Sequence, residues 1–282
     1  MTTIKLHSAL VSVDWLAEHI DAPDLVLLDA SVGKPVSGKI AAQDLAGWIP
    51  RTQRFDFDKT ICDQDSALPH MLPSAADFTA AVRKLGVNKD SRIVLYDKQG
   101  IYTSPRGWWM FRAMGYSQVA VLDGGFPAWK AAGHAVVEIA PAVPGNFVAD
   151  YRSELIWDAA QVQVALGSKE IDVIDARSQG RFHGTAPEPR SGLRPGHMPH
   201  TINLPFDRLI KDGCMRSKSE LQKIFAEKQQ NKQQQLVFSC GSGVTACILA
   251  LGAELAGYIN LAVYDGSWSE WGLPSELPVT TE

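Results

Sequence analysis

The sequence repeats itself once, and this internal repeat constrains the fold more than any other feature. Four landmarks occur in the same order in both halves, beginning with an apolar segment that ends in Asp-Ala and finishing with one that runs into Asp-Gly and a tryptophan. The matched landmarks lie 142 to 149 residues apart: Asp29 with Asp175, Gly47 with Gly196, Asp97 with Cys240, and Asp123 with Asp265. A near-constant shift of this size indicates a duplicated domain and not a short solenoid repeat.

Short apolar segments alternate with segments of helical pattern in each half. Residues 25–30 and 171–176 are typical of buried strands, whereas residues 75–85 and 220–225 have helical spacing. Strands that alternate with helices predict βαβ units and an α/β fold, in which a parallel sheet is covered by helices on both faces. In such sheets ligands bind beyond the carboxyl ends of the strands.

The length of 282 residues fits two domains of this kind. We expect one domain over residues 1–140 and a second over 147–282. The linker is expected at about residues 139–146, where two prolines and a glycine interrupt any helix or strand. Repeat and linker together predict two tandem domains.

Composition argues against several classes of protein. The formal net charge is −4, which gives no electrostatic reason to bind nucleic acid or a membrane surface. No apolar run approaches the roughly 20 residues of a spanning helix, and the first residues have no long apolar core or Arg-rich stretch. The four cysteines are widely spaced without a CxxC pair, so we expect no metal, no cofactor and no disulfide framework. These features favour a cytoplasmic protein with reduced thiols.

The second half carries a cysteine where a predicted strand meets a glycine-rich turn. The apolar run 236–238 leads to Cys240, and a helix-compatible run follows over 247–255. Backbone N–H groups at a helix N-terminus favour an anion, and they lower a thiol pKa from about 8.5 to roughly 3.5–7.5. We therefore predict that Cys240 is a thiolate nucleophile; the alternative is an inert, buried cysteine at a strand end.

The first half has an aspartate at the corresponding position. Asp97 is followed by Lys98-Gln99-Gly100, which is not a compact Gly-x-Gly turn. Because a carboxylate cannot act as a soft sulfur nucleophile, we expect the first half to be catalytically inert.

With these features in view, the chain resembles the rhodanese superfamily, and within it a tandem-domain sulfurtransferase. The resemblance covers about residues 10–271 and is most specific at Cys-Gly-Ser-Gly-Val-Thr (240–245), Asp-Gly-Ser-Trp-Ser-Glu-Trp (265–271) and the segment 181–190. The Gly-Ser pair after the cysteine is that of the mercaptopyruvate branch, whereas the thiosulfate branch has Arg-Lys there. Trp48 departs from the family pattern, which usually has a histidine at this position.

The resemblance implies a reaction. Cys240 would attack the thiol sulfur of 3-mercaptopyruvate, release pyruvate and hold the sulfur as a persulfide, which a second thiol then removes. The expected acceptor is a thiol such as thioredoxin, or cyanide.

The resemblance also assigns substrate binding to Arg181 and Arg190. A guanidinium binds the single carboxylate of a 2-oxo acid through paired hydrogen bonds. Without the resemblance, both arginines could equally be surface residues or partners of Glu188. Four residues of the cysteine loop complete the expected substrate-binding set: Gly241, Gly243, Val244 and Thr245.

A proton must be delivered to the leaving group, because that group is expected to be pyruvate enolate. The resemblance implies a relay of Ser242, His70 and Asp58, of which Asp58 matches the family spacing less securely. Histidine shuttles protons readily near neutral pH, although a histidine that only bonds a loop is the alternative interpretation.

There are three alternatives to this function. A cysteine phosphatase needs an arginine at the position that Ala246 occupies, so that interpretation fails. A thiosulfate sulfurtransferase and a non-enzymatic carrier of persulfide sulfur remain alternatives.

Cys247 fits a buried helix cysteine better than one that resolves an oxidised Cys240.

Overall fold

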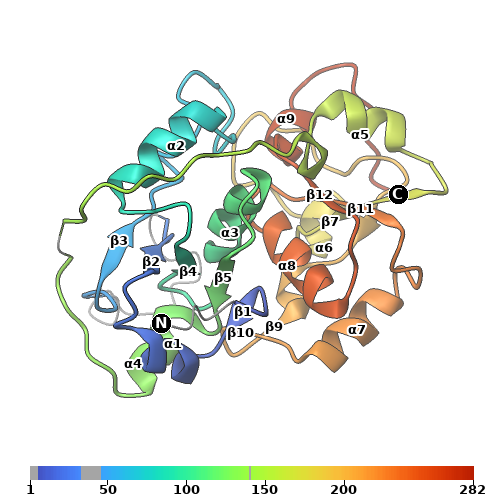
Figure 1. Cartoon of the computed structure of the whole chain (residues 1–282). Helices are drawn as coiled ribbons and strands as arrows, with labels where there is room; N and C mark the ends of the chain where they lie inside the picture. Colours follow the sequence, from blue (N-terminus) through green and yellow to red (C-terminus); the bar gives the residue numbers. More distant parts are fainter. Residues whose placement is uncertain (1–5, 33–45, 140) are drawn as a thin grey trace. The chain divides into compact units, whose positions relative to one another are not determined.

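The computed structural model describes residues 6–32, 46–139 and 141–282, and its contacts divide the chain into two units (Figure 1). The first unit contains the described residues of Met1–Gln64, Leu72–Tyr151 and Asp212–Met215. The second contains Asp65–Met71, Arg152–Lys211 and Arg216–Glu282. The short segment Asp65–Met71 therefore belongs to the second unit although it lies in the first half of the sequence. The domain limits expected from the sequence, 1–140 and 147–282, remain a prediction.

The first unit is built on a five-stranded sheet in which every pairing is parallel. Its spatial order is β1-β5-β4-β2-β3, so β4 is the central strand. The strands are β1 (Leu10–Val11), β2 (Leu25–Asp29), β3 (Thr52–Arg54), β4 (Arg92–Tyr96) and β5 (Val119–Leu122). The helices are α1 (Val13–His19), α2 (Ala75–Lys84), α3 (Ser104–Ala113) and α4 (Gly125–Ala131), and β10 (Cys214–Met215) belongs to the same unit.

Helices cover both faces of this sheet. On one face Leu16 of α1 and Phe126 of α4 pack into the core with Val94 and Leu122. The other two helices pack against each other, since Phe78 of α2 and Phe111 of α3 form an edge-to-face pair with ring centroids 5.0 Å apart. The sheet is therefore buried on both sides, which explains why its strands read as nearly continuous apolar runs.

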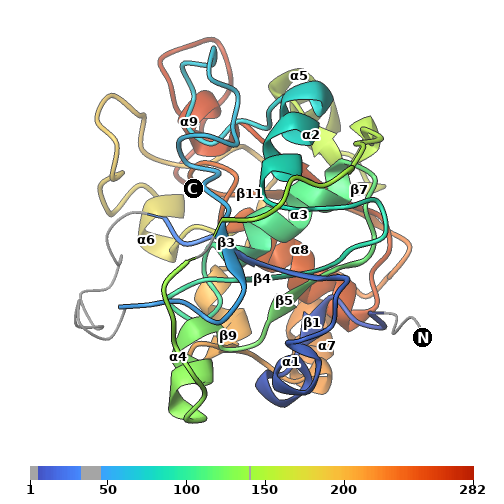
Figure 2. The ribbon, with the colours of Figure 1, turned by 60° about the vertical axis from the view of Figure 1, so that its left-hand side comes forward.

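The second unit repeats this architecture. Its five strands are also parallel and follow the order β6-β12-β11-β7-β8, with β11 at the centre. The strands are β6 (Ile156–Trp157), β7 (Ile171–Asp175), β8 (Ile202–Asn203), β11 (Gln235–Ser239) and β12 (Leu261–Tyr264). The remaining elements are α5 (Ala159–Ala165), α6 (Gln179–Phe182), α7 (Lys218–Ala226), α8 (Ala246–Ala256), α9 (Ser267–Trp271), β9 (Ile210–Lys211) and the 3-10 turns Ser153–Leu155 and Phe206–Leu209. Figure 2 shows the chain after α6 (yellow to tan) running out as a long loop.

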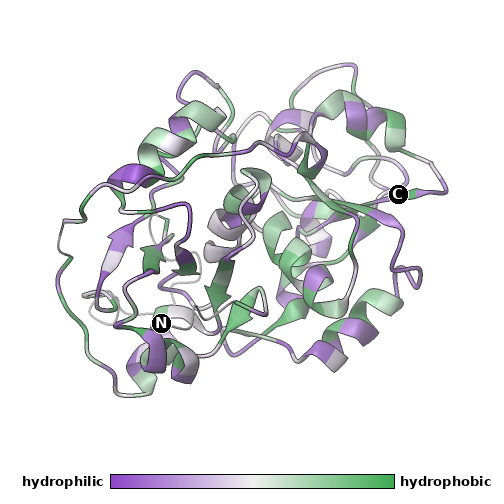
Figure 3. Cartoon of the chain, in the orientation of Figure 1, coloured by the Kyte–Doolittle hydropathy of each residue, from purple (hydrophilic) through white to green (hydrophobic). Residues whose placement is uncertain are grey.

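Helix α8 is apolar almost all round because it is buried. Nine of its residues are buried, and Gly257 ends it in the left-handed conformation with φ of 97°. Figure 3 shows the contrast with α7, where hydrophobic and hydrophilic residues alternate as on a surface helix. Among the described residues, no helix has the length and apolar character needed to cross a bilayer.

The predicted fold class is confirmed, and the strands of the two five-stranded sheets follow the same order. Strands β4 and β11 begin 143 residues apart at Arg92 and Gln235, and β5 and β12 begin 142 residues apart at Val119 and Leu261. Helix α3 begins at Ser104. Pro105 lies in the first turn, where its missing N–H costs nothing, so it does not block the helix there.

Candidate active site

The candidate nucleophile lies on a loop at the carboxyl end of the central strand of the second unit. Cys240 follows β11 directly, and α8 begins six residues later at Ala246. We call residues 240–245 the Cys240 loop. Cys240 is buried, with 1% of its surface exposed. The predicted strand, loop and helix are all present, and they place the sulfur at the sheet edge where parallel α/β folds bind ligands.

A serine anchors the base of the Cys240 loop. Ser267 Oγ accepts hydrogen bonds from the backbone N–H of Cys240 (3.1 Å) and of Gly243 (3.2 Å). It donates one to the carbonyl of Tyr264 (2.8 Å). Ser267 itself has a φ of 51°, a left-handed conformation that a non-glycine residue rarely keeps without a structural or functional reason. The loop is therefore held from the end of β12.

The sulfur of Cys240 receives no hydrogen bond from the described residues, so the expected stabilisation of a thiolate by loop N–H groups remains a prediction. The thiol of Cys247, in contrast, makes a hydrogen bond. Cys247 is fully buried, and its Sγ donates to the carbonyl of Gly243 at 3.1 Å. These contacts are those of a structural helix cysteine.

Ser242 and His70 lie together although they are 172 residues apart in the sequence. Ser242 Oγ is 3.0 Å from His70 Nδ1, and both residues belong to the second unit. His70 has a φ of 63°, so its backbone is held in an unfavourable conformation. Asp58 belongs to the first unit, and its place as third member of the relay stays a prediction.

Arg181 stands beside the Cys240 loop. Its Nη2 lies 3.0 Å from the position that a Cβ on Gly241 would take, so the glycine leaves room for the guanidinium. Arg181 also donates to Glu188 Oε2 from Nη2 (2.6 Å) and from Nε (3.1 Å). The pairing with Glu188, which the sequence left as an alternative, is present in the structure, and substrate binding by Arg181 remains a prediction.

Glu188 joins two arginines. Its Oε1 accepts from Arg177 Nη1 at 2.8 Å, and Arg177 in turn makes a paired contact with Asp175. Burial would lower the pKa of Arg177, but Asp175 and Glu188 raise it above its ordinary value. The Arg177 guanidinium also lies 4.0 Å from the ring centroid of Trp268. Carboxylates and guanidinium groups thus alternate from the end of β7 to the Cys240 loop.

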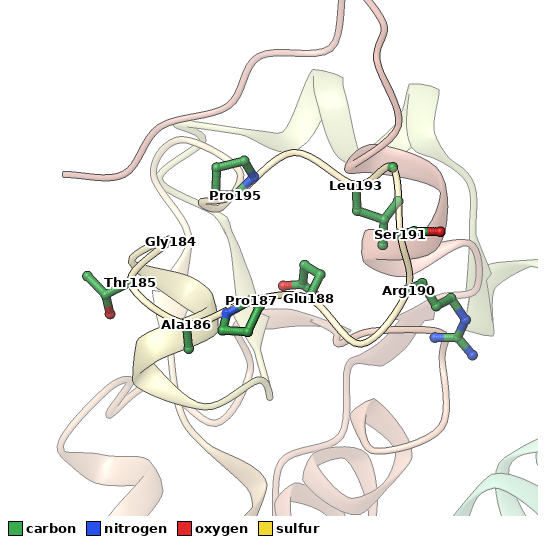
Figure 4. A pocket seen from close by; sticks show the side chains of 10 residues that line it. Gly184, Thr185, Ala186, Pro187, Glu188, Arg190, Ser191, Leu193 and Pro195 are labelled. Atoms are coloured by element: carbon green, nitrogen blue, oxygen red, sulfur yellow. The ribbon is translucent and has the colours of Figure 1, made fainter.

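Arg190 is placed differently. It is exposed and lines an open hollow of about 350 Å³ formed by the loop after α6. Figure 4 shows its guanidinium directed away from that hollow. The hollow is lined by residues of 184–195 and by no residue of the Cys240 loop. Substrate binding by Arg190 therefore remains a prediction, and so do the roles of Gly243, Val244 and Thr245.

The comparisons with known proteins bear on this site. A model of the rhodanese-like domain matches residues 12–132 and again residues 158–273. The chain belongs to the rhodanese family. It is 38% identical to the 3-mercaptopyruvate sulfurtransferase of Escherichia coli K12, with 95% of this chain and 96% of that one covered. It is 42% identical to the human 3-mercaptopyruvate sulfurtransferase, covering 96% and 94%.

Two further matches concern donor and fold. The mouse thiosulfate sulfurtransferase is 42% identical, covering 94% of this chain and 92% of that one. The crystal structure of SseA from Escherichia coli, described as a 3-mercaptopyruvate sulfotransferase, has a TM-score of 0.81 at 34% identity, covering 93% and 100%. Overall identity thus does not separate relatives of the two branches, and the donor has to be argued from the loop.

Sequence reasoning missed two residues that organise this site, Ser267 and Arg177. Ser267 occupies the position of Gly125 in the first half, 142 residues earlier. A serine replacing a glycine at a left-handed position is a visible signal when the halves are compared. Arg177 follows the Asp-Ala landmark directly, but nothing in the sequence indicated that it turns back onto Asp175.

Proposed function

We propose that Cys240 is the sulfur-carrying nucleophile of this chain, with Ser242 and His70 managing the proton and Arg181 receiving the substrate carboxylate. The chain is a sulfurtransferase, and 3-mercaptopyruvate is its sulfur donor. Relatives with that activity align over nearly the whole length. The observation that carries the residue assignment is the position of Cys240 at the carboxyl end of β11, with Ser242, His70 and Arg181 gathered around its loop.

The first step transfers sulfur to the protein. The Cys240 thiolate attacks the thiol sulfur of 3-mercaptopyruvate, a new S–S bond forms, and the C–S bond breaks. The electron pair of that bond leaves with pyruvate enolate, and the proton of the donor thiol stays on the outer sulfur of the persulfide. A thiolate acceptor then attacks the outer sulfur and returns Cys240 as a thiolate.

The enolate needs a proton to become pyruvate. Ser242 Oγ and His70 Nδ1 are within hydrogen-bond distance at 3.0 Å, which fits a pair that relays a proton to the leaving carbon. His70→Ala should therefore slow pyruvate release more than it weakens donor binding.

The loop chemistry supports 3-mercaptopyruvate over thiosulfate. Gly241 and Ser242 follow the cysteine without a positive charge, whereas a thiosulfate dianion carries its charge next to the reacting sulfur. A 2-oxo acid carries one charge at its carboxylate, away from the thiol. Arg181 beside Gly241 suits that carboxylate, since guanidinium binds carboxylates through paired hydrogen bonds.

We propose a thiol acceptor such as thioredoxin, with cyanide as an acceptor in assays, and a cytoplasmic location. The four cysteines, all among the described residues, are free, as in a reducing compartment. A non-enzymatic persulfide carrier is the second candidate, because a carrier would use the same loop cysteine.

Intact mass after incubation with 3-mercaptopyruvate tests the proposal, together with pyruvate release. We expect a gain of one sulfur atom on the wild-type protein and on Cys214→Ser, and none on Cys240→Ser. Wild-type protein that releases no pyruvate would favour the carrier. A clear preference for thiosulfate in thiocyanate formation would overturn the donor assignment.

A further inference from the structure

Glu188 is the buried carboxylate that pairs with Arg181 beside the Cys240 loop, and none of the roles described so far uses it. Its side chain is 4% exposed, compared with 23% for Arg181. Its two oxygens are divided between two cations, Arg177 on one side and Arg181 on the other. A carboxylate held this way is fixed in position by charge-assisted hydrogen bonds.

The charges in this chain of contacts cancel. Asp175 and Glu188 each carry a negative charge, and Arg177 and Arg181 each carry a positive one. Arg177 and Asp175 are fully buried, so their contact is screened little by solvent. The guanidinium of Arg181 next to Gly241 thus approaches the Cys240 loop with its charge already compensated.

Compensation of charge affects the two sulfur donors unequally. Thiosulfate brings two negative charges to the reacting end of the molecule, so it gains most from a net positive field at the loop. 3-Mercaptopyruvate brings one charge at its far end and can bind it to a single guanidinium. At an effective dielectric constant of about 20, a unit charge several ångströms away changes the binding of an anion by about tenfold or more.

We propose that Glu188 is a specificity-determining residue, which disfavours thiosulfate by cancelling the positive charge that Arg181 would otherwise present to the Cys240 loop. This inference rests on the proposed function of Cys240 and Arg181. Selectivity against a dianion is then produced by a fixed carboxylate as well as by the uncharged Gly-Ser pair of the loop. Such an arrangement works by unfavourable electrostatics against the wrong donor.

The test compares donors within one preparation of each variant. Glu188→Gln keeps the shape of the side chain and removes its charge, and Glu188→Asp keeps the charge. For each variant kcat/KM is measured with thiosulfate and with 3-mercaptopyruvate, using cyanide as the common acceptor. The ratio of the two values does not depend on the fraction of protein that is folded.

We expect Glu188→Gln to raise the thiosulfate to 3-mercaptopyruvate ratio on the order of tenfold. Glu188→Asp should keep the ratio within about twofold of wild type. The matched control is Glu227→Gln, which removes a carboxylate from the exposed Arg208–Glu227 ion pair and should leave the ratio unchanged. Added salt should lower thiosulfate turnover more steeply in Glu188→Gln than in wild type, an effect that a purely structural role would not produce.

An unchanged ratio in Glu188→Gln, or an equal rise in Glu188→Asp, would overturn this proposal. The wild-type protein separates this failure from that of the proposed function. If wild type releases pyruvate from 3-mercaptopyruvate and the ratio does not move, only the role of Glu188 is wrong. If wild type does not use 3-mercaptopyruvate at all, the function proposed for the site is wrong.

Discussion

The loops that follow the two central strands have the same origin and hold different groups. In the first unit, Asp97 is fully buried, and its Oδ2 accepts the backbone N–H of Tyr102, Thr103 and Ser104, each at 2.9 Å. Its Oδ1 accepts the N–H of Gln99 at 2.9 Å. In the second unit the matching position is Cys240. One loop thus encloses a fixed carboxylate, and the other has a sulfur atom in its place.

The Asp97 loop (residues 97–102) shows that backbone N–H groups after a central strand can hold an anion. Backbone N–H groups that converge on one point form a site for an anion. Burial raises the pKa of Asp97, while the N–H groups of Ser104 and Tyr102 oppose that rise. Backbone N–H groups of residues 99 and 102–104 hold the carboxylate of the Asp97 loop. A similar anion site for a thiolate in the Cys240 loop stays a prediction, because no described residue donates a hydrogen bond to that sulfur.

The largest expected effect comes from making the second loop like the first. Cys240→Asp should abolish sulfur transfer, by about 10³-fold or more, because a carboxylate cannot carry sulfur. The unit should still fold, since Asp97 shows that such a loop accommodates a buried carboxylate. Pyruvate release and urea unfolding are the measurements.

Cys240→Leu is the control, because leucine is apolar and larger than cysteine. If Cys240→Asp unfolds at a much lower urea concentration than Cys240→Leu, the second loop is not a site for an anion, and the comparison fails.

The next effect is on the stability of the first unit. Asp97→Asn places an amide NH₂ where a carboxylate oxygen accepts N–H groups, and we expect a loss of about 2–4 kcal/mol in the free energy of unfolding. Hydrogen exchange of peptides from β4 and α3 locates the loss. The exposed Asp21→Asn is the control and should change stability by less than about 0.5 kcal/mol. Unchanged protection in Asp97→Asn would mean that these N–H groups do not need an anion.

A smaller effect is expected at Ser267, which anchors the Cys240 loop and for which the first half has Gly125. Ser267→Ala leaves the N–H groups of Cys240 and Gly243 without their acceptor, which should cost about 1–3 kcal/mol of stability. We also expect kcat to fall while KM changes little, because the loop loses its fixed position. Ser219→Ala, on the exposed face of α7, is the control. Full activity in Ser267→Ala would show that the loop holds its geometry without this anchor.

The smallest expected effect concerns the glycine that follows the nucleophile. In Gly241→Ala the new Cβ would lie 3.0 Å from Arg181 Nη2, so the guanidinium has to shift. We expect KM for 3-mercaptopyruvate to rise about tenfold, which corresponds to about 1.4 kcal/mol of binding. Gly133→Ala strains a backbone with a φ of 79° but brings its Cβ within 4 Å of no atom, so it controls for a general loss of stability and should leave KM unchanged. An unchanged KM would mean that Arg181 does not hold the substrate.

Much of the site could be predicted because its signal is local. The apolar run before Cys240, the glycines after it and the apolar helix α8 are contiguous, so strand, loop and helix could be expected in order. Arg181 was assigned to substrate binding only through a family resemblance, since its distance from Gly241 depends on where the fold places α6 beside the Cys240 loop.

The sequence by itself determined the duplication and the parallel α/β architecture, and it predicted Cys240, not Asp97, as the nucleophile. These features follow from hydrophobic periodicity and residue type, which are properties of residues close together along the chain. Only the tertiary structure decided that Ser267 anchors the loop, that His70 reaches Ser242, and that Arg181 shares Glu188 with Arg177. Such contacts join segments far apart in the chain, and no local pattern encodes which side chains will meet when both faces of a sheet are packed.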